Sequence, residues 1–273
     1  MFKLLFAVIL LALVVLPTSV SAQSRNVWID GDHGKLSAVV QTLDGLDKFP
    51  LVIICHGITG CKNHFLYAQL AEDLEELGIA SIRFDFNGHG KSDGRFQDMT
   101  VPNEIEDARH VYEYAKNLRG VTSVSIAGHS QGGVVASMLA GQLGAKKIKA
   151  VTLMAPAAVL RDNARAGEFL GASCDPANPP EYVEIFGVFK LGRNYILTAQ
   201  NLPIYETAAK YTGSALIVHG TADPLVPYGY GLRYHDTYKN SRIELLNGFD
   251  HNFTQDTQRV SEIVADFFAS QLK

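Results

Sequence analysis

Residues 124–134 read VSIAGHSQGGV, and this stretch decides the fold. The apolar run Val124–Ala127 predicts a strand and the stretch Val134–Leu143 predicts a helix, so residues 128–132 form the turn between them. A serine on such a sharp turn has a strained backbone, which flanking glycines tolerate because they carry no side chain. The free N–H groups of the helix N-terminus point at the same spot. The pattern therefore predicts that Ser130 is a nucleophile.

A nucleophilic serine needs a base that takes its proton and a third group that orients the base. Hydrolytic enzymes with this turn carry the acid and then the histidine after the serine in the chain. Asp223 closely follows the apolar run Ala215–His219, and His251 follows the predicted strand Arg242–Leu246. Both positions fit this order at the carboxyl edge of a sheet, so we predict a triad of Ser130, Asp223 and His251.

Three other residues near the predicted triad are given structural rather than catalytic roles. Asp250 is adjacent to the histidine, but adjacent side chains point apart, which favours a role in capping its loop. His219 precedes the acid in the chain, so a buried structural role is favoured for it. His129, inside the turn, is most simply a packing residue.

Two backbone donors are expected for the negative oxygen that forms on the substrate carbonyl. One is the N–H of Gln131, the residue after the nucleophile. The other is the N–H of Ile58, in the segment 56–60 that follows the apolar run Leu51–Cys55. This segment reads HGITG, which is a weak signal alone and a strong one together with the serine turn.

The rest of the chain alternates short apolar runs with amphipathic stretches, which is typical of a parallel sheet with helical crossovers. A hairpin over residues 27–42 precedes this alternation. The sequence predicts an α/β fold with a doubly wound, mostly parallel sheet. Helices are predicted at residues 66–77, 104–118, 134–143 and 260–268, and strands at residues 51–55, 80–86, 123–127, 150–154, 215–219 and 242–246.

One interval breaks this alternation. Sixty residues, rich in glycine, proline and aromatic side chains, separate Met154 from Ala215. A long insertion in a compact α/β domain is usually functional and is often a lid over the active site. We expect an inserted lid at about residues 156–210, within a single domain that spans residues 23–273.

The chain has 273 residues, 47% of them hydrophobic, and a formal net charge of -4. Residues 1–22 combine an early lysine, an apolar run from Leu4 to Leu16 and a small-residue end at Ala22. This predicts a secretory signal peptide that is cut before Gln23, with an uncleaved membrane anchor as the alternative. The mature chain is then secreted or periplasmic, without stable membrane association.

Composition also restricts the classes of molecule and metal that the protein is expected to bind. The mildly acidic mature chain has no Lys/Arg cluster, which argues against nucleic acid. Of the three cysteines, Cys55, Cys61 and Cys174, a local bridge between the first two is conceivable, but three thiols are favoured. Zinc-type spacings of His and Cys are absent from the sequence, so neither a metal nor a cofactor is expected. The oligomeric state is left open, a homodimer included.

With these motifs the chain resembles the α/β-hydrolases, and more narrowly the bacterial cinnamoyl and feruloyl esterases. The resemblance covers nearly the whole mature chain. In that family a small lid closes over an aromatic acyl group, and lid residues bind its phenolic hydroxyl. The residues that carry the resemblance are 56–60, 83–94, 128–133, 155–158 and 202–206, with the segments around Asp223 and His251.

The resemblance also implies substrate contacts. Tyr195 matches the lid tyrosine of the family, and packing inside the lid is its alternative role. The acidic lid position of the family falls on Asp162 or Asn163, with Asn163 slightly favoured, and a glutamine of the family is Leu170 here.

The implied function is an exported serine carboxylesterase that cleaves hydroxycinnamate esters, as small molecules or linked to oligosaccharides, through an acyl-enzyme. Alternatives on the same scaffold are a short-chain acyl esterase, a monoacylglycerol lipase and a peptidase, because fold and triad do not choose the leaving group. A non-catalytic binding protein is the remote alternative.

Overall fold

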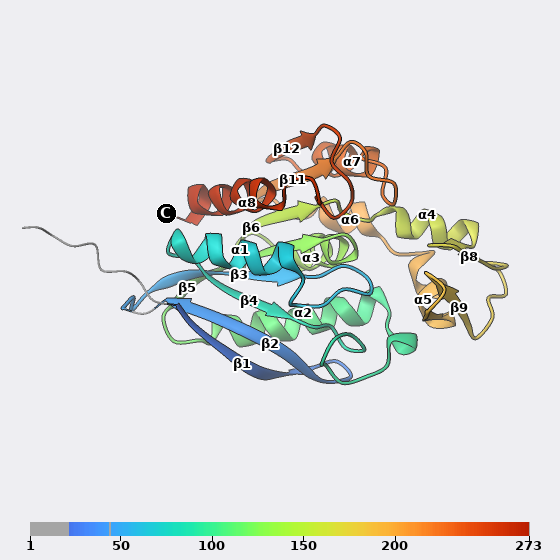
Figure 1. Ribbon diagram of the computed structural model, residues 1–273, viewed down its shortest axis with the longest axis horizontal. Helices are drawn as coiled ribbons and strands as arrows, with labels where there is room; N and C mark the ends of the chain where they lie inside the picture. Colours follow the sequence, from blue (N-terminus) through green and yellow to red (C-terminus); the bar gives the residue numbers. More distant parts are fainter. Residues whose placement is uncertain (1–21, 44, 273) are drawn as a thin grey trace, which may run out of the picture.

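An eight-stranded sheet forms the centre of the molecule, in a computed structural model that describes residues 22–43 and 45–272 (Figure 1). The strands are Ala22–Gly31 (β1), Gly34–Leu43 (β2), Phe49–Cys55 (β3), Ala80–Phe84 (β4), Val121–His129 (β5), Ile148–Met154 (β6), Ser214–Gly220 (β11) and Ser241–Leu246 (β12). They lie in the order β1-β2-β4-β3-β5-β6-β11-β12. β2 pairs antiparallel with β1 and β4, and all other neighbours in this sheet run parallel. The predicted mostly parallel sheet is confirmed.

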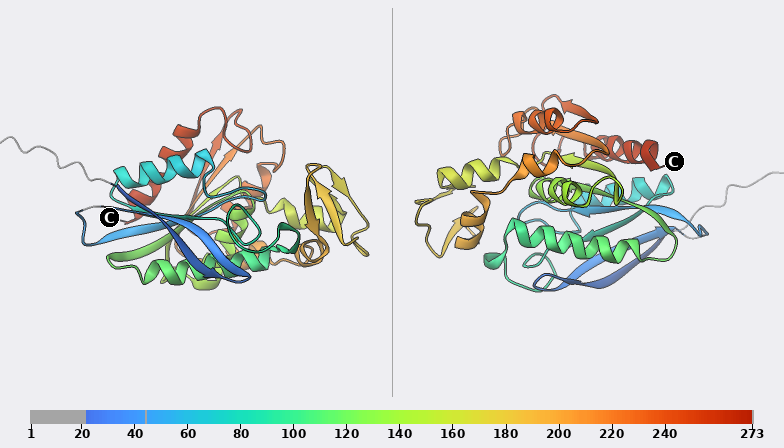
Figure 2. Two further views of the ribbon diagram at one scale, coloured as in Figure 1. Left: turned by 60° about the horizontal axis from the view of Figure 1, so that its bottom comes forward. Right: turned by 180° about the vertical axis from the view of Figure 1, so that it is seen from behind.

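Helices cover both faces of the sheet (Figure 2). The main helices are Phe65–Glu76 (α1), Val101–Lys116 (α2), Gln131–Leu143 (α3), Gly229–Thr237 (α7) and Thr257–Leu272 (α8). On one face α1 and α8 pack together, and Leu70 and Phe268 belong to a shared apolar core with the sheet. On the other face Val111 of α2 and Leu139 of α3 belong to a second core. Two cores on opposite faces of one sheet are what a doubly wound fold requires.

The predicted strands and helices all occur, with ends that differ by a few residues. α2 begins three residues earlier than the periodicity indicated, because Thr100 caps it. The hydroxyl of Thr100 accepts a hydrogen bond from the N–H of Asn103 at 3.3 Å, and Pro102 occupies the first turn, where it costs no hydrogen bond. α7 has no counterpart among the predicted helices.

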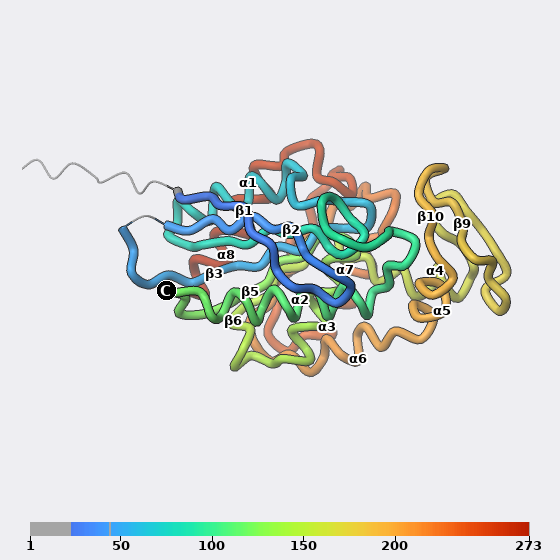
Figure 3. The backbone as a smooth tube through the Cα atoms, turned by 90° about the horizontal axis from the view of Figure 1, so that it is seen from below, coloured from blue at the N-terminus to red at the C-terminus, as the bar shows by residue number. Residues whose placement is uncertain are grey.

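Residues 155–213, here called the insert, connect β6 to β11 and contain most of the structure that the sequence did not predict. The insert consists of Val159–Ala166 (α4), Glu168–Phe169 (β7), Ala172–Ser173 (β8), Tyr182–Ile185 (β9), Phe189–Gly192 (β10), Arg193–Ala199 (α5) and Ile204–Ala208 (α6). Its small strands, α4 and α5 project at one end of the molecule (Figures 1 and 3). Leu191, Tyr195 and Ile196 of the insert belong to the same core as α2 and α3, so the insert is continuous with the main domain.

Two sequence predictions concern targeting and thiols. The predicted signal peptide, residues 1–22, lies outside the described residues apart from Ala22, which begins β1. Among residues 22–43 and 45–272, no helix combines the length and the apolar content needed to cross a bilayer. Cys55, Cys61 and Cys174 are all free thiols.

A buried ion pair joins the loop after β3 to the loop after β4. Lys62 Nζ lies 2.5 Å from Asp85 Oδ2, and the two side chains are 4% and 1% exposed. The Asp85 carboxylate also accepts hydrogen bonds from the N–H groups of Lys62 at 2.7 Å and Lys91 at 2.9 Å. One carboxylate therefore fixes both loops at the carboxyl edge of the sheet.

Removing the cation of this pair is expected to destabilise the fold. Lys62→Met leaves the Asp85 carboxylate buried without its counterion, which costs about 3–5 kcal/mol of unfolding free energy. Urea unfolding measures this loss. The matched control is Lys35→Met, which breaks the exposed pair of Lys35 with Asp30 and should leave the unfolding midpoint nearly unchanged. Equal midpoints for the two variants would contradict the role of the buried pair.

Candidate active site

The turn between β5 and α3 holds Ser130 in a conformation that few residues adopt. Its backbone has φ 56° and ψ -125°, as predicted for a serine on a strained strand-to-helix turn. The tightness of the turn explains Gly128, because a Cβ there would lie only 2.1 Å from the carbonyl oxygen of Gly132. The turn is anchored to the next strand by the Ser130 N–H, which donates to the carbonyl of Met154 at 2.9 Å.

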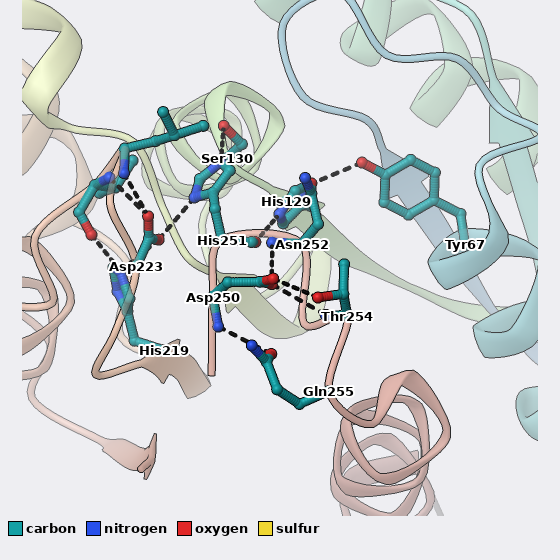
Figure 4. Close-up of polar contacts among 12 residues, drawn as sticks. Tyr67, His129, Ser130, His219, Asp223, Asp250, His251, Asn252, Thr254 and Gln255 are labelled. Carbon is teal, nitrogen blue, oxygen red and sulfur yellow. Dashed lines mark hydrogen bonds and ion pairs between the residues drawn. The ribbon is translucent and has the colours of Figure 1, made fainter. Parts of the chain in front are cut away.

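The structure brings together the three residues of the predicted triad (Figure 4). Ser130 Oγ lies 2.9 Å from His251 Nε2, and His251 Nδ1 lies 2.7 Å from Asp223 Oδ2. Asp223 stands in the loop after β11 and His251 in the loop after β12, so residues far apart in the sequence meet at the carboxyl edge of neighbouring strands.

The Asp223 carboxylate sets the direction of the hydrogen bonds along the triad. Burial by itself would raise the pKa of Asp223, but hydrogen bonds from His219 and His251 outweigh it and lower the pKa. The N–H groups of Leu225 at 2.9 Å and Val226 at 2.8 Å also donate to Oδ1. The ionised carboxylate only accepts, so His251 carries a proton on Nδ1 and its Nε2 is free to accept the proton of the Ser130 hydroxyl.

The structure also places Asp250 and His219, two of the residues near the triad for which the sequence favoured structural roles. The Asp250 carboxylate accepts N–H groups of Asn252 at 3.1 Å and Thr254 at 3.0 Å, so it caps its own loop. His219 is fully buried, and its Nε2 lies 2.9 Å from the carbonyl of Val226 and 3.3 Å from Asp223 Oδ2. This contact with the triad carboxylate was not predicted.

The loop after β3 contains Ile58, the other predicted oxyanion donor, and hydrogen bonds within the loop orient the Gly57 peptide. The Gly57 carbonyl accepts the N–H of Gly60 at 2.9 Å and lies 2.8 Å from His56 Nδ1. In a trans peptide the C=O and the next N–H point in opposite directions, so the N–H of Ile58 is turned away from these contacts. A Cβ on Gly57 would lie 2.8 Å from Ser130 Cβ, so only glycine lets the loop approach Ser130 this closely.

The second expected donor, Gln131, is the first residue of α3, where backbone N–H groups have no partner within the helix. Its side chain lies between α2 and the insert. Gln131 Nε2 donates to Glu104 Oε2 at 2.8 Å, and the hydroxyl of Tyr195 donates to Gln131 Oε1 at 2.7 Å. Burial raises the pKa of Glu104 well above its usual range. The sequence pattern of α2 did not predict this contact between Glu104 and Gln131.

A cavity of about 280 Å³ lies beside Ser130 and His251 and is lined in part by the insert. Ile58, Ser130, Gln131 and His251 are among the residues that line it. The insert contributes mainly apolar and aromatic side chains to the lining, together with one carboxamide and one phenol. These are Ala157, Val159, Leu160, Asn163, Phe169, Leu170, Phe186, Leu191 and Tyr195.

The predicted substrate contacts occupy different places. Asn163 and Tyr195 both line the cavity, although the Tyr195 hydroxyl already donates to Gln131. Asp162, the other candidate for the acidic lid position, instead accepts a hydrogen bond from the hydroxyl of Tyr230 at 2.8 Å. The structure therefore separates two neighbours between which the sequence only slightly favoured Asn163.

Comparisons with known proteins agree with this architecture. Residues 50–172 match a family model for the alpha/beta hydrolase fold. A ferulic acid complex of Est1E from Butyrivibrio proteoclasticus is 37% identical, with a TM-score of 0.86, over 90% of this chain and 98% of that one. Mouse alpha/beta hydrolase domain-containing protein 10 has the same fold, with 19% identity and a TM-score of 0.70 over 90% of this chain and 99% of that one.

Among curated proteins, lysophosphatidylserine lipase ABHD12 from Gallus gallus is 29% identical over 232 residues, which are 80% of this chain. The matched region spans only 58% of the length of that relative. The fold, the turn that carries Ser130 and the extent of the match to Est1E together establish that the chain belongs to the alpha/beta hydrolase family.

Proposed function

We propose that the protein is a serine carboxylesterase that hydrolyses esters of hydroxycinnamic acids such as ferulate. The observation that carries the proposal is the unbroken contact from Ser130 Oγ through His251 to Asp223, at 2.9 and 2.7 Å, at the bottom of an aromatic-lined cavity. The match to a ferulic acid complex over nearly the whole of both chains supports the acyl group proposed here.

In the first half of the reaction, Ser130 Oγ attacks the ester carbonyl carbon while His251 Nε2 takes the hydroxyl proton. The electron pair of the C=O bond moves to the oxygen, which the N–H groups of Ile58 and Gln131 stabilise. The intermediate collapses, the bond to the alcohol breaks, and His251 gives its proton to the departing oxygen. Asp223 stays ionised and stabilises the imidazolium.

In the second half, water attacks the acyl-enzyme. His251 takes a proton from the water, the Ser130 ester bond breaks, and His251 returns the proton to the serine oxygen. Each step uses only groups of this chain, the ester and water.

The lining of the cavity favours an aromatic acyl group with a hydroxyl at its far end. A flat aromatic ring matches the apolar residues of the insert, including Phe169 and Leu170. The Asn163 carboxamide and the lone pairs of the Tyr195 oxygen can bond a phenolic hydroxyl. A long alkyl chain would cover Asn163 without offering a hydrogen bond, which carries a free-energy cost.

A lysophospholipid or acylglycerol lipase is the second candidate, and the similarity to lysophosphatidylserine lipase ABHD12 favours it. The matched region covers only 58% of the length of that relative, so its lipase activity is the weaker proposal for this chain. We also propose that residues 1–22 direct export, and that the insert serves as the lid.

Substrate panels separate these candidates. We expect methyl ferulate to be cleaved with a higher kcat/KM than p-nitrophenyl butyrate, a monoacylglycerol, a lysophospholipid or an aminoacyl arylamide. Ser130→Ala should lower kcat by about 10⁶-fold on any true substrate, because the nucleophile is lost. Negligible ferulate turnover beside fast lipid turnover would exclude the hydroxycinnamate proposal, and an unchanged rate in Ser130→Ala would exclude the serine mechanism.

The acid of the triad can be tested against its neighbour in the loop after β12. Asp223→Asn should lower kcat by about 10⁴-fold, because the amide no longer orients His251 with its proton on Nδ1. Asp250→Asn should change kcat by less than about tenfold, because Asp250 bonds only its own loop among the described contacts. Steady-state kinetics on methyl ferulate gives both values, and the reverse ranking would refute this assignment.

The phenolic contact of Asn163 is tested with a pair of substrates. Asn163→Leu should lower kcat/KM for methyl ferulate about tenfold more than for methyl cinnamate, which lacks the hydroxyl. Asp162→Asn is the matched control and should leave this ratio unchanged, since Asp162 faces Tyr230. If the ratio is the same for wild type and Asn163→Leu, Asn163 does not bind the hydroxyl.

A further inference from the structure

Tyr67 and His129 form a second buried hydrogen-bonded chain beside the triad (Figure 4). The Tyr67 oxygen lies 2.9 Å from His129 Nδ1, and His129 Nε2 lies 2.8 Å from the backbone carbonyl of His251. The N–H of Gly57 lies 3.3 Å from the Tyr67 oxygen. The two side chains are 2% and 3% exposed, and the proposed reaction steps use neither of them.

The chemistry of the partners fixes the direction of every hydrogen bond in this chain. The His251 carbonyl can only accept, so His129 carries its proton on Nε2. Burial, together with the nearby His251 ring, lowers the pKa of His129 to about 3, so the ring is neutral and its Nδ1 has a free lone pair. The Tyr67 hydroxyl therefore donates to Nδ1, and the Tyr67 oxygen accepts the N–H of Gly57.

These three bonds connect the parts of the site that must stay aligned during the reaction. His129 is the residue before the nucleophile, so its bond to the His251 carbonyl ties the backbone of the base to the turn that carries Ser130. Gly57 precedes Ile58, whose N–H is a proposed oxyanion donor. Tyr67, on α1, reaches the oxyanion loop and the serine turn at once.

We propose that Tyr67 and His129 are positioning residues, which hold the His251 backbone and the oxyanion loop in fixed geometry relative to Ser130. This rests on the proposed serine esterase mechanism. It assigns His129 a role beyond packing under the turn. Losing the Tyr67 hydroxyl would leave a buried N–H and a buried ring nitrogen without partners, which loosens both loops.

The first test is Tyr67→Phe, which keeps the aromatic ring and removes only the hydroxyl. We expect kcat on p-nitrophenyl butyrate to fall about tenfold and KM to stay within about twofold, because the ester pocket keeps its shape. The matched control is Tyr211→Phe. The Tyr211 hydroxyl is also buried and donates to a backbone carbonyl, that of Ile148 at 3.0 Å, but it belongs to the core beneath α3 and β6.

Each kcat is divided by the fraction of protein with a competent site. This fraction is the proportion of Ser130 that a fluorophosphonate labels covalently when the labelling reaction has reached its endpoint. The proposal is supported if the loss in Tyr67→Phe remains after this correction while Tyr211→Phe keeps the wild-type kcat. If the loss disappears after correction, Tyr67 contributes only to folding and the proposal is wrong.

A double-mutant cycle tests whether the two residues act as one unit. His129→Gln places an amide N–H near the former Nε2 but removes the acceptor that the Tyr67 hydroxyl needs. The variant with both changes should therefore lose little more activity than His129→Gln alone. Losses that simply multiply would overturn the proposal.

Wild type and Ser130→Ala, assayed together with these variants, separate this inference from the proposed function. If hydrolysis depends on Ser130 but the kcat of Tyr67→Phe per labelled site equals that of wild type, only the positioning roles are refuted. If Ser130→Ala hydrolyses the ester as fast as wild type, the esterase mechanism itself is refuted.

Discussion

The site depends on one constraint, the strained backbone of Ser130. A non-glycine residue at φ 56° and ψ -125° costs on the order of 1–3 kcal/mol, and the surrounding structure must hold it there. It does so with three backbone hydrogen bonds, from the Ser130 N–H to Met154 and from the N–H groups of Gly133 and Ala157 to the Ser130 carbonyl. These bonds, to β6, to the start of α3 and to the segment after β6, thus hold the serine oxygen above the sheet edge.

The electrostatics around this turn follow from burial. Desolvation lowers the pKa of His56 and His129 to about 3 and that of His89 to about 4, so these rings are neutral at neutral pH. Of these rings, His129 lies against His251, with ring centroids 4.9 Å apart. An imidazolium that forms on His251 in the proposed reaction would meet the Asp223 carboxylate on one side and the uncharged ring of His129 on the other.

Much of the fold could be predicted from the sequence because its parallel strands are short apolar runs bounded by clear turns. The serine turn and the residues after the last strands were predictable for the same reason, since their places at the sheet edge follow from chain order. The insert was different. Its strands of two to four residues carry too little periodicity to identify. Asp162 and Asn163 are adjacent in α4, and the sequence did not show which of them reaches the cavity. Contacts such as Glu104 with Gln131 link distant segments, which leaves no local pattern.

The bond between Tyr195 and Gln131 has a consequence for protein engineering. Because the insert supplies a hydrogen bond to the residue that follows Ser130, exchanging it for the corresponding segment of a relative would change more than the shape of the cavity. A chimera without a phenol at this position would leave a buried amide oxygen unpaired against the start of α3. Grafts designed to broaden the range of esters should therefore retain Tyr195, or replace Gln131 and Glu104 together with it.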